Sequence, residues 1–309
     1  MTKRFFAIIA ILASLVTDHA LSQDLDKTLK VDGRLRQYQI HLPPGFSREK
    51  KYPVILAFHG GGGSYKKTAK FYDFNPLADQ DIFIVVYPNA VNKAWSMPGI
   101  SSRVKNLDST VDDVHFISNL IDTLIFDYYA DPLRIYCTGI SRGGMFSFYL
   151  AYKLPDKIRA IAPVCGGISR TVAADYELKR HIPVLMINGT EDKFVSYEGG
   201  PGKLNKRNEE NEDADMLPSE ELLAKLVKMY NCNPRPLITN IPDIDPEDGC
   251  HAIDYFYSGG GTPVEFIKVV GGGHTWPGGS QYLPKFLIGR VCRDFNASEK
   301  IFEFFRNTQ

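Results

Sequence analysis

Short apolar runs, spaced through the chain, constrain its fold more than any other feature. They cover residues 54–58, 82–87, 133–137, 160–164 and 184–187. A strand of a parallel sheet is covered by helices on both faces, so its sequence is continuously apolar rather than alternating. The runs therefore predict parallel strands, with residues 264–270 as a later one. Residues 35–42 instead alternate between apolar and polar, which is typical of a half-exposed strand.

The segments between these runs have helical spacing. After Asp112 and Asp113, apolar residues recur at intervals of three and four up to Tyr128, which predicts an amphipathic helix. Two acidic residues at its first turn interact favourably with the helix dipole. Residues 144–153 and 298–306 are further helical stretches. Strands that alternate with helices predict an α/β fold, with a mostly parallel central sheet and helices on both faces.

The first 22 residues have the features of an export signal. Lys3 and Arg4 precede an apolar run over residues 5–16, and small residues follow at Ala20 and Ser22. The run is too short to cross a bilayer, which takes roughly 20 residues. We therefore predict a cleaved signal peptide over residues 1–22 and a secreted or periplasmic protein without a stable membrane anchor. Residues 23–309 are expected to form a single domain.

The charge balance excludes one large class of partners. The chain has 36 basic and 36 acidic residues, and 44% of its residues are hydrophobic, as in ordinary globular proteins. A nucleic-acid-binding protein would show a basic excess or a basic stripe. We expect no nucleic-acid partner, and the sequence carries no sign of an oligomeric state.

A candidate nucleophile lies where a predicted strand meets a predicted helix. The strand over residues 133–137 leads into Gly139-Ile140-Ser141-Arg142-Gly143, and residues 144–153 follow as a helix. The G-x-S-x-G pattern needs this context, because its glycines permit a strained turn that lifts the serine hydroxyl above the sheet. The alternative, an ordinary surface turn, does not account for this position, so we predict Ser141 as a nucleophile.

A serine nucleophile needs a base, and the base needs a carboxylate that orients it. In the fold that carries this motif, the partners follow in the order serine, acid, histidine, each after a later strand. Asp192 lies just after the run that ends at residue 187, and His274 lies in a Gly-rich loop after residues 264–270. We predict Asp192 and His274 as these partners, with Glu191 as the alternative acid.

A second Gly-rich loop is suited to an oxyanion. The strand over residues 54–58 ends in His59-Gly60-Gly61-Gly62-Gly63. This matches the HGGG-type loop that supplies one backbone donor, and the residue after the nucleophile supplies the other. We therefore predict an oxyanion hole formed by the amides of Gly61 and Arg142. A phosphate-binding loop is the competing interpretation, but the glycine spacing does not match one.

The other histidines have no comparable motif around them. His41, His181 and His251 are expected to be structural or solvated, and His115 is expected to lie on a helix face. No H-x-x-x-H or similar ligand spacing occurs, so we expect no metal.

The five cysteines lie at 137, 165, 232, 250 and 292, and no pair has C-x-x-C spacing. Cys137 and Cys165 lie in or beside apolar strands, where a buried free thiol is expected. Cys232 and Cys250 lie in loop-like sequence of a chain bound for an oxidising compartment, so we predict a disulfide between them. Cys292 is left without an evident partner.

Together these motifs resemble the polyhydroxybutyrate depolymerase-like esterases, which overlap with the feruloyl and acetylxylan esterases of carbohydrate esterase family 1. The resemblance covers nearly the whole chain after residue 22. It implies hydrolysis of carboxylic esters by a serine triad, without a cofactor. The motifs that carry it are His59-Gly60-Gly61-Gly62, Val86-Tyr87-Pro88-Asn89-Ala90 with Trp95, Asp112-Asp113-Val114, Gly139-Ile140-Ser141-Arg142-Gly143-Gly144, Gly189-Thr190-Glu191-Asp192 and Gly272-Gly273-His274-Thr275-Trp276-Pro277-Gly278.

The substrate follows less directly than the chemistry. His115 takes the place of the small residue that commonly follows Asp-Asp-Val in the group, and Arg142 that of the Asn or small residue that often follows the nucleophile. Both departures bear on the leaving-group side of a pocket. Trp95 and Trp276 are candidates for stacking on an aromatic acyl group or a sugar ring, or else for packing the walls of the site. Expected substrates are feruloyl or acetyl esters of plant polysaccharide, or hydroxyalkanoate esters. An inactive ligand-binding relative and a serine peptidase are the alternatives. Residues 199–217 are expected to form either a flap over the site or a surface loop.

Overall fold

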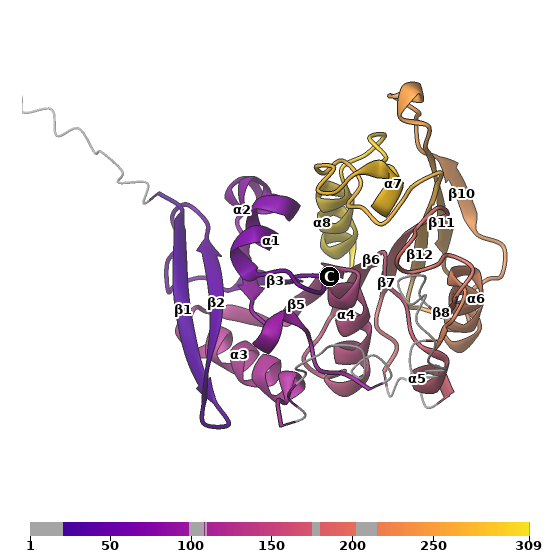
Figure 1. Ribbon diagram of the computed structural model, residues 1–309. Helices are drawn as coiled ribbons and strands as arrows, with labels where there is room; N and C mark the ends of the chain where they lie inside the picture. Colours follow the sequence, from indigo (N-terminus) through magenta and orange to yellow (C-terminus); the bar gives the residue numbers. More distant parts are fainter. Residues whose placement is uncertain (1–20, 99–107, 109, 175–179, 202–214, 309) are drawn as a thin grey trace, which may run out of the picture.

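One ten-stranded sheet runs through the computed structural model of the protein, which describes residues 21–98, 108, 110–174, 180–201 and 215–308 (Figure 1). Its strand order is β1-β2-β4-β3-β5-β6-β7-β12-β11-β10. The strands from β4 to β12 in this order are parallel, and antiparallel strands extend both edges. The strands are β1 (Gln23–Val31), β2 (Arg34–Leu42), β3 (Tyr52–Phe58), β4 (Ile84–Pro88), β5 (Ala130–Ile140), β6 (Ala160–Val164), β7 (Val184–Gly189), β10 (Leu237–Asn240), β11 (His251–Tyr257) and β12 (Val264–Val270).

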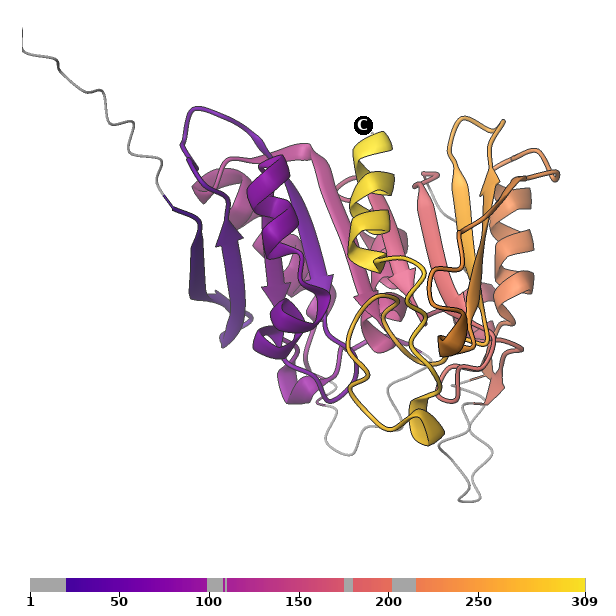
Figure 2. The same cartoon turned by 90° about the horizontal axis from the view of Figure 1, so that it is seen from above.

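Helices cover both faces of this sheet, as expected from the sequence. The face with Val54, Leu56 and Phe58 packs against α3 (Asp113–Asp127), α4 (Arg142–Lys153) and α6 (Ser219–Met229). The face with Ile55 and Ala57 packs against α1 (Tyr65–Tyr72), α2 (Asn75–Asp81) and α8 (Ala297–Asn307), and Figure 2 shows α8 lying along the sheet. Because successive residues of a strand point to opposite faces, the apolar runs contribute to both cores. The protein therefore has the α/β-hydrolase fold.

Most of the predicted elements are confirmed. The half-exposed strand is β2, whose burial alternates from Leu35 to Ile40, and the continuous runs are β3 to β7 and β12. One predicted boundary was wrong, because Ile82 is the left-handed C-cap of α2 and β4 begins at Ile84. The long amphipathic helix is α3, and the Asp112 side chain caps it by accepting a hydrogen bond from the amide of His115.

Elements that the sequence did not predict lie mostly at the sheet edges and on its outer surface. They include β1, β10, β11, the short helices α1, α2, α5 (Arg170–Ala174) and α7 (Lys285–Ile288), and the two-stranded pair β8 (Gly200–Pro201) and β9 (Asp215–Met216). The predicted signal peptide, apart from its last two residues, and residues 202–214 of the predicted flap lie outside the described residues. Within the described residues, no helix is long and apolar enough to cross a membrane.

Candidate active site

Ser141 lies on a strained turn between β5 and α4. Its φ and ψ angles are 58° and −123°, a backbone conformation that L-residues rarely adopt. The turn packs tightly against the end of β3: a Cβ at Gly139 would lie 2.5 Å from the carbonyl oxygen of Phe58, and one at Gly143 would lie 2.3 Å from it. Only glycine fits at these two positions, so the motif glycines are explained by the close approach of β3.

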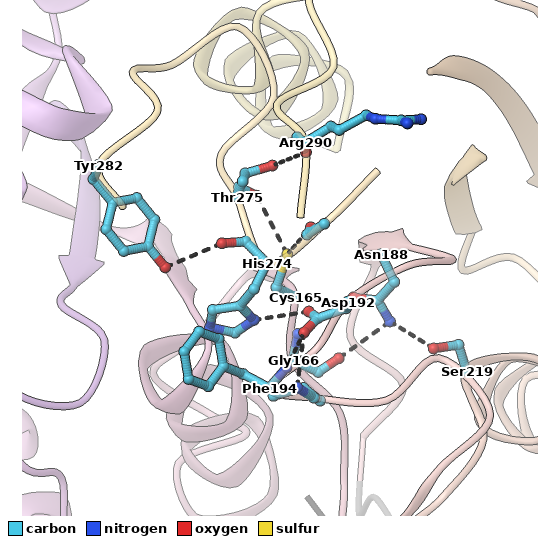
Figure 3. Close-up of polar contacts among 12 residues, drawn as sticks. Cys165, Gly166, Asn188, Asp192, Phe194, Ser219, His274, Thr275, Tyr282 and Arg290 are labelled. Carbon is cyan, nitrogen blue, oxygen red and sulfur yellow. Dashed lines mark hydrogen bonds and ion pairs between the residues drawn. The ribbon is translucent and has the colours of Figure 1, made fainter. Parts of the chain in front are cut away.

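His274 and Asp192 meet beside this turn, although 82 residues separate them. The imidazole Nδ1 lies 2.7 Å from Asp192 Oδ2, and both side chains are buried (Figure 3). The other carboxylate oxygen accepts the amides of Phe194 and Val195, each at 2.8 Å. The carboxylate is therefore held from both sides, with one oxygen directed at the imidazole. Glu191, the alternative acid, is exposed.

The loop that carries His274 is fixed by the last residue of α7 and by the segment that follows this helix. The amide of His274 donates to the carbonyl oxygen of Ile288 at 2.6 Å, and the amide of Gly273 donates to that of Arg290 at 2.9 Å. The Tyr282 hydroxyl donates to the carbonyl oxygen of His274 at 3.0 Å (Figure 3). These hydrogen bonds fix the backbone at His274, so the orientation of the imidazole does not depend on Asp192 alone.

Ser141 and His274 line the same cavity, which has a volume of about 430 Å³. Its walls are mainly apolar and include Phe71, Tyr72 and Ile140. The rings of Phe71 and Tyr282 meet edge to face, with centroids 5.4 Å apart. Lys67 and Lys70 also line the cavity, and both are exposed. A partly apolar pocket with a few polar groups is the usual form of a small-molecule site.

The predicted oxyanion loop forms another wall of this cavity. Gly61 lines it, whereas the amides of Gly62 and Gly63 donate to the carbonyl oxygens of Lys93 and Gly60. Arg142 is the first residue of α4, so its amide has no acceptor within the helix. Gly61 and Ser141, the residue just before α4, therefore line the same cavity.

The side chain of His59 stabilises this oxyanion loop through hydrogen bonds of both ring nitrogens. Its Nε2 accepts the amide of Ala90 at 3.0 Å, so the proton of the neutral ring is on Nδ1, which donates to the carbonyl oxygen of Gly60 at 2.8 Å. Burial lowers the pKa of His59 to about 4, although the bond to Gly60 acts in the opposite direction. His59 is thus neutral at physiological pH and acts as a fixed structural link.

Tyr72 joins the two loops and was not predicted from the sequence. Its hydroxyl donates to the carbonyl oxygen of Phe58 and accepts the amide of Ile140, both at 2.8 Å. It therefore connects the end of β3 with the residue just before Ser141. No local signal marks Tyr72, because its two partners are far away in the sequence.

The two tryptophans do not face the cavity, which corrects the expected stacking role. Trp95 is fully buried, stacks on Phe146 at 4.8 Å, and donates to the carbonyl oxygen of His59 at 2.9 Å. Trp276 is 1% exposed and stacks on Tyr72 at 4.0 Å. Both indoles support the walls of the site, which was the other interpretation. The aromatic rings that line the cavity are those of Phe71, Tyr72 and Tyr282.

The predicted disulfide between Cys232 and Cys250 is also absent. All five cysteines lie in described ranges, and none of them is bonded to another in this structure. Cys232 packs in one hydrophobic core with its thiol directed at the carbonyl oxygen of Thr262, whereas Cys250 packs in the core on the other face of the sheet. Sequence spacing could not reveal this, because the two positions flank β10 and lie on opposite sides of the sheet.

The side chains of Arg142 and His115, the two departures from the resemblance, lie away from the cavity. The Arg142 side chain is buried, and its Nε donates to the carbonyl oxygen of Trp95 at 2.9 Å. His115 is on the surface, with Nδ1 3.0 Å from the carboxylate of Asp32. Neither side chain is among the residues that line the cavity.

One cluster near the site has the side chains of a metal centre. Donor atoms of Cys165, Asp192 and His274 lie within 4.8 Å of one another. The Asp192 oxygens already bind His274 and two amides, and the Cys165 thiol donates to the carbonyl oxygen of Thr275 at 3.3 Å. Burial raises the pKa of this thiol well above its usual value, so it is protonated rather than a thiolate ligand. The cluster is better suited to orienting His274 than to binding a metal.

Residues 31–169 match a family described as putative esterases. The chain is 28% identical over 285 residues to the putative esterase NocK of Nocardia uniformis subsp. tsuyamanensis, covering 89% of this chain and 80% of that protein. It is 28% identical over 242 residues to feruloyl esterase B of Piromyces equi, and 25% identical over 274 residues to poly(3-hydroxyalkanoate) depolymerase C of Paucimonas lemoignei. These two matches cover 78% and 79% of this chain, but only 42% and 59% of those longer proteins.

Solved structures agree on the fold. The acetyl xylan esterase from Aspergillus awamori superposes with a TM-score of 0.55 at 16% identity, covering 82% of this chain and 94% of that one. At this identity the likeness supports the α/β-hydrolase fold and not a particular substrate.

Proposed function

We propose that this chain hydrolyses esters through Ser141, His274 and Asp192. The premise is that it is a carboxylic ester hydrolase related to the feruloyl esterases and polyhydroxyalkanoate depolymerases. The observation that carries this proposal is the 2.7 Å contact between His274 Nδ1 and Asp192 Oδ2, beside a cavity that Ser141 also lines. A carboxylate at Nδ1 keeps the proton on that nitrogen and leaves Nε2 free to act as a base.

The catalytic cycle follows from these positions. As Ser141 Oγ attacks the ester carbonyl, His274 takes the hydroxyl proton, and Asp192 stabilises the imidazolium. The amides of Gly61 and Arg142 donate to the oxyanion, and His274 then protonates the leaving alkoxide. Water repeats the sequence on the acyl-enzyme and releases the acid. Each step uses groups of this chain, without a cofactor.

The cavity favours esters with an aromatic acyl group. Its walls include the rings of Phe71 and Tyr282, and aromatic rings stack or meet edge to face with such a group. The ammonium groups of Lys67 and Lys70 can donate to the oxygens of a phenol, a methoxy group or a sugar. We therefore place feruloyl esters of plant polysaccharide first, followed by acetyl esters. Hydroxyalkanoate esters stay a candidate because of the depolymerase relative.

We also propose that the protein is exported and loses residues 1–22. The first strand, β1, begins at Gln23, directly after the proposed cleavage site, so cleavage there would leave the sheet intact. A sequenced N-terminus of the protein from culture medium or periplasm tests this, with Gln23 as the expected first residue.

Initial rates on methyl ferulate, acetylated xylan, hydroxybutyrate oligomers and p-nitrophenyl acetate test the activity. We expect the highest kcat/KM on the ferulate, and we expect Ser141→Ala to lower any measured rate by about 10⁴-fold or more. A Ser141→Ala variant that keeps most of its activity would overturn the mechanism. Binding of these esters without turnover would favour an inactive ligand-binding relative, and faster cleavage of peptide amides would favour a peptidase.

A further inference from the structure

Two buried cysteines lie together beside the loop that carries His274. Cys250 directly precedes β11 and is 4% exposed, whereas Cys292 lies between α7 and α8 and is fully buried. Asp248 links their backbones. Its Oδ1 accepts the amide of Cys250, and its Oδ2 accepts the amide of Arg293, the residue after Cys292, each at 2.7 Å. Because a single carboxylate binds both amides, the two segments lie side by side.

The two side chains are also in contact. Both thiols lie against Asp248: the Cys250 thiol points at its carbonyl oxygen at 4.0 Å, and the Cys292 sulfur lies within 4.8 Å of one of its carboxylate oxygens. Burial and the neighbouring Cys250 side chain raise the pKa of the Cys292 thiol. A second hydrogen bond joins the two segments: Arg290 Nη1 donates to the carbonyl oxygen of Gly249 at 3.2 Å. Neighbouring backbone segments that each carry a cysteine are what a disulfide requires, since its two Cα atoms must lie within about 7 Å.

We propose that Cys250 and Cys292 form a disulfide in the mature protein. The inference rests on the exported location under the proposed function, because disulfides persist in oxidising compartments. Each thiol loses its proton, the two sulfur atoms form one S–S bond, and two electrons pass to the disulfide of a thiol oxidoreductase, which is reduced to two thiols. Both cysteines become buried on folding, so the bond forms before the two segments close.

This disulfide would hold the backbone that positions the candidate base. The segment from Ile288 to Cys292 accepts the amides of Gly273, His274 and Gly278 through the carbonyl oxygens of Arg290, Ile288 and Cys292. The bond closes a loop of roughly forty residues that contains β11, β12 and His274 itself. A cross-link of this length stabilises the fold by restricting the unfolded chain.

The neighbouring carboxylates do not make a metal site the better interpretation. Donor atoms of Asp248, Cys292 and Asp294 lie within 4.8 Å of one another. Both Asp248 oxygens already accept backbone amides, however, and Asp294 Oδ1 accepts the amide of Ile244 at 3.1 Å. Asp294 Oδ2 accepts the Cys292 thiol at 3.5 Å, so each of the four carboxylate oxygens already has a hydrogen-bond donor of this chain.

The test counts thiols in the purified full-length chain after it has been unfolded, reduced and refolded in a glutathione redox buffer, so that both cysteines are accessible while the bond forms. Alkylation under denaturing conditions should label three of the five cysteines, and all five after reduction, and a proteolytic map should contain one peptide pair joined through Cys250 and Cys292. Reduction of the wild-type protein should lower its Tm by about 5–10 °C. This comparison needs no variant and so does not depend on a variant's folding.

Matched variants identify the pair. Cys250→Ser and Cys292→Ser should each abolish the response of Tm to reduction, whereas Cys232→Ser should keep it. Five labelled thiols in the oxidised sample, or a cross-link to Cys232, would overturn the proposal. The thiol count should be the same in Ser141→Ala, so the test of the disulfide does not depend on the proposed esterase activity. Because the redox buffer supplies the oxidising conditions, the test also does not depend on whether the protein is exported.

Discussion

Acidification should destabilise this protein through His59, by an amount that can be worked out from the structure. Burial lowers the pKa of this imidazole to about 4, whereas the ordinary histidine pKa of 6.5 applies to the unfolded chain. Protonation of Nε2 would also break the hydrogen bond from the amide of Ala90 that supports the oxyanion loop. The folded state therefore requires the neutral ring.

The sign of the effect follows from proton linkage. Between pH 6.5 and pH 4 the unfolded chain binds a proton on this ring and the folded chain does not, so stability falls as the pH falls. One pKa unit is worth about 1.4 kcal/mol, and the gap between the two pKa values therefore corresponds to about 3 kcal/mol. This contribution is fully present above pH 6.5 and is lost as the pH falls through 4.

Urea unfolding of the wild type and of His59→Gln, measured from pH 4.5 to pH 7.5, tests this reasoning. Glutamine does not titrate, so the free energy of unfolding of the variant should depend less steeply on pH, by up to about 1.4 kcal/mol per pH unit. His115→Gln, which removes an exposed imidazole, is the control for the loss of a histidine elsewhere. Parallel curves for the wild type and His59→Gln would refute the account of the buried neutral ring.

Three further substitutions probe the site and the sheet. Asp192→Asn should lower kcat by about 10⁴-fold, because the amide favours the wrong tautomer of His274. The control Glu191→Gln should leave kcat within about twofold. Equal losses of kcat in the two variants, measured in steady-state assays, would contradict the choice of Asp192 as the acid. Gly143→Ala places a methyl group 2.3 Å from a backbone oxygen and should lower Tm by about 5 °C or more in a thermal melt, whereas Gly167→Ala, with its nearest neighbour at 3.5 Å, should be tolerated. Burial, with repulsion from Asp254, raises the pKa of Glu265 to about 8, so stability is lost as the pH rises from 4.5 through 8. Glu265→Gln should therefore unfold at higher urea concentration than the wild type above pH 8 and at a similar concentration near pH 4.5, and a similar difference at both pH values would argue against this.

The strands that build the sheet's centre could be predicted because their burial is recorded in the sequence. Residues of β3 and β4 are apolar on both faces, and the runs 54–58 and 82–87 show this directly. The strand β11 was missed because it includes His251 and Asp254 and is only partly buried. The four residues of β10 are all exposed, so no apolar pattern marks them. Edge strands are defined by hydrogen bonds to a neighbour, which local composition does not encode.

In the candidate site too, some features could be predicted from the sequence and others depend on contacts that only the fold creates. Ser141, Asp192 and His274 could be named from motifs, because their chemistry requires particular residue types in particular loops. The direction in which Trp95 and Trp276 point could not be predicted, because an aromatic residue near a site lines the cavity or packs into the core according to its neighbours. Cysteine partners and the link through Tyr72 depend likewise on segments that only the fold brings together.

Labelling with a fluorophosphonate tests the central claim most directly, because it requires an activated serine and no knowledge of the substrate. Intact mass and peptide mapping should show a single adduct, on Ser141, and its rate of formation should fall by about 10³-fold or more in His274→Ala. An adduct on a different residue, or an unchanged labelling rate without the imidazole, would contradict the proposal that Ser141, His274 and Asp192 act together.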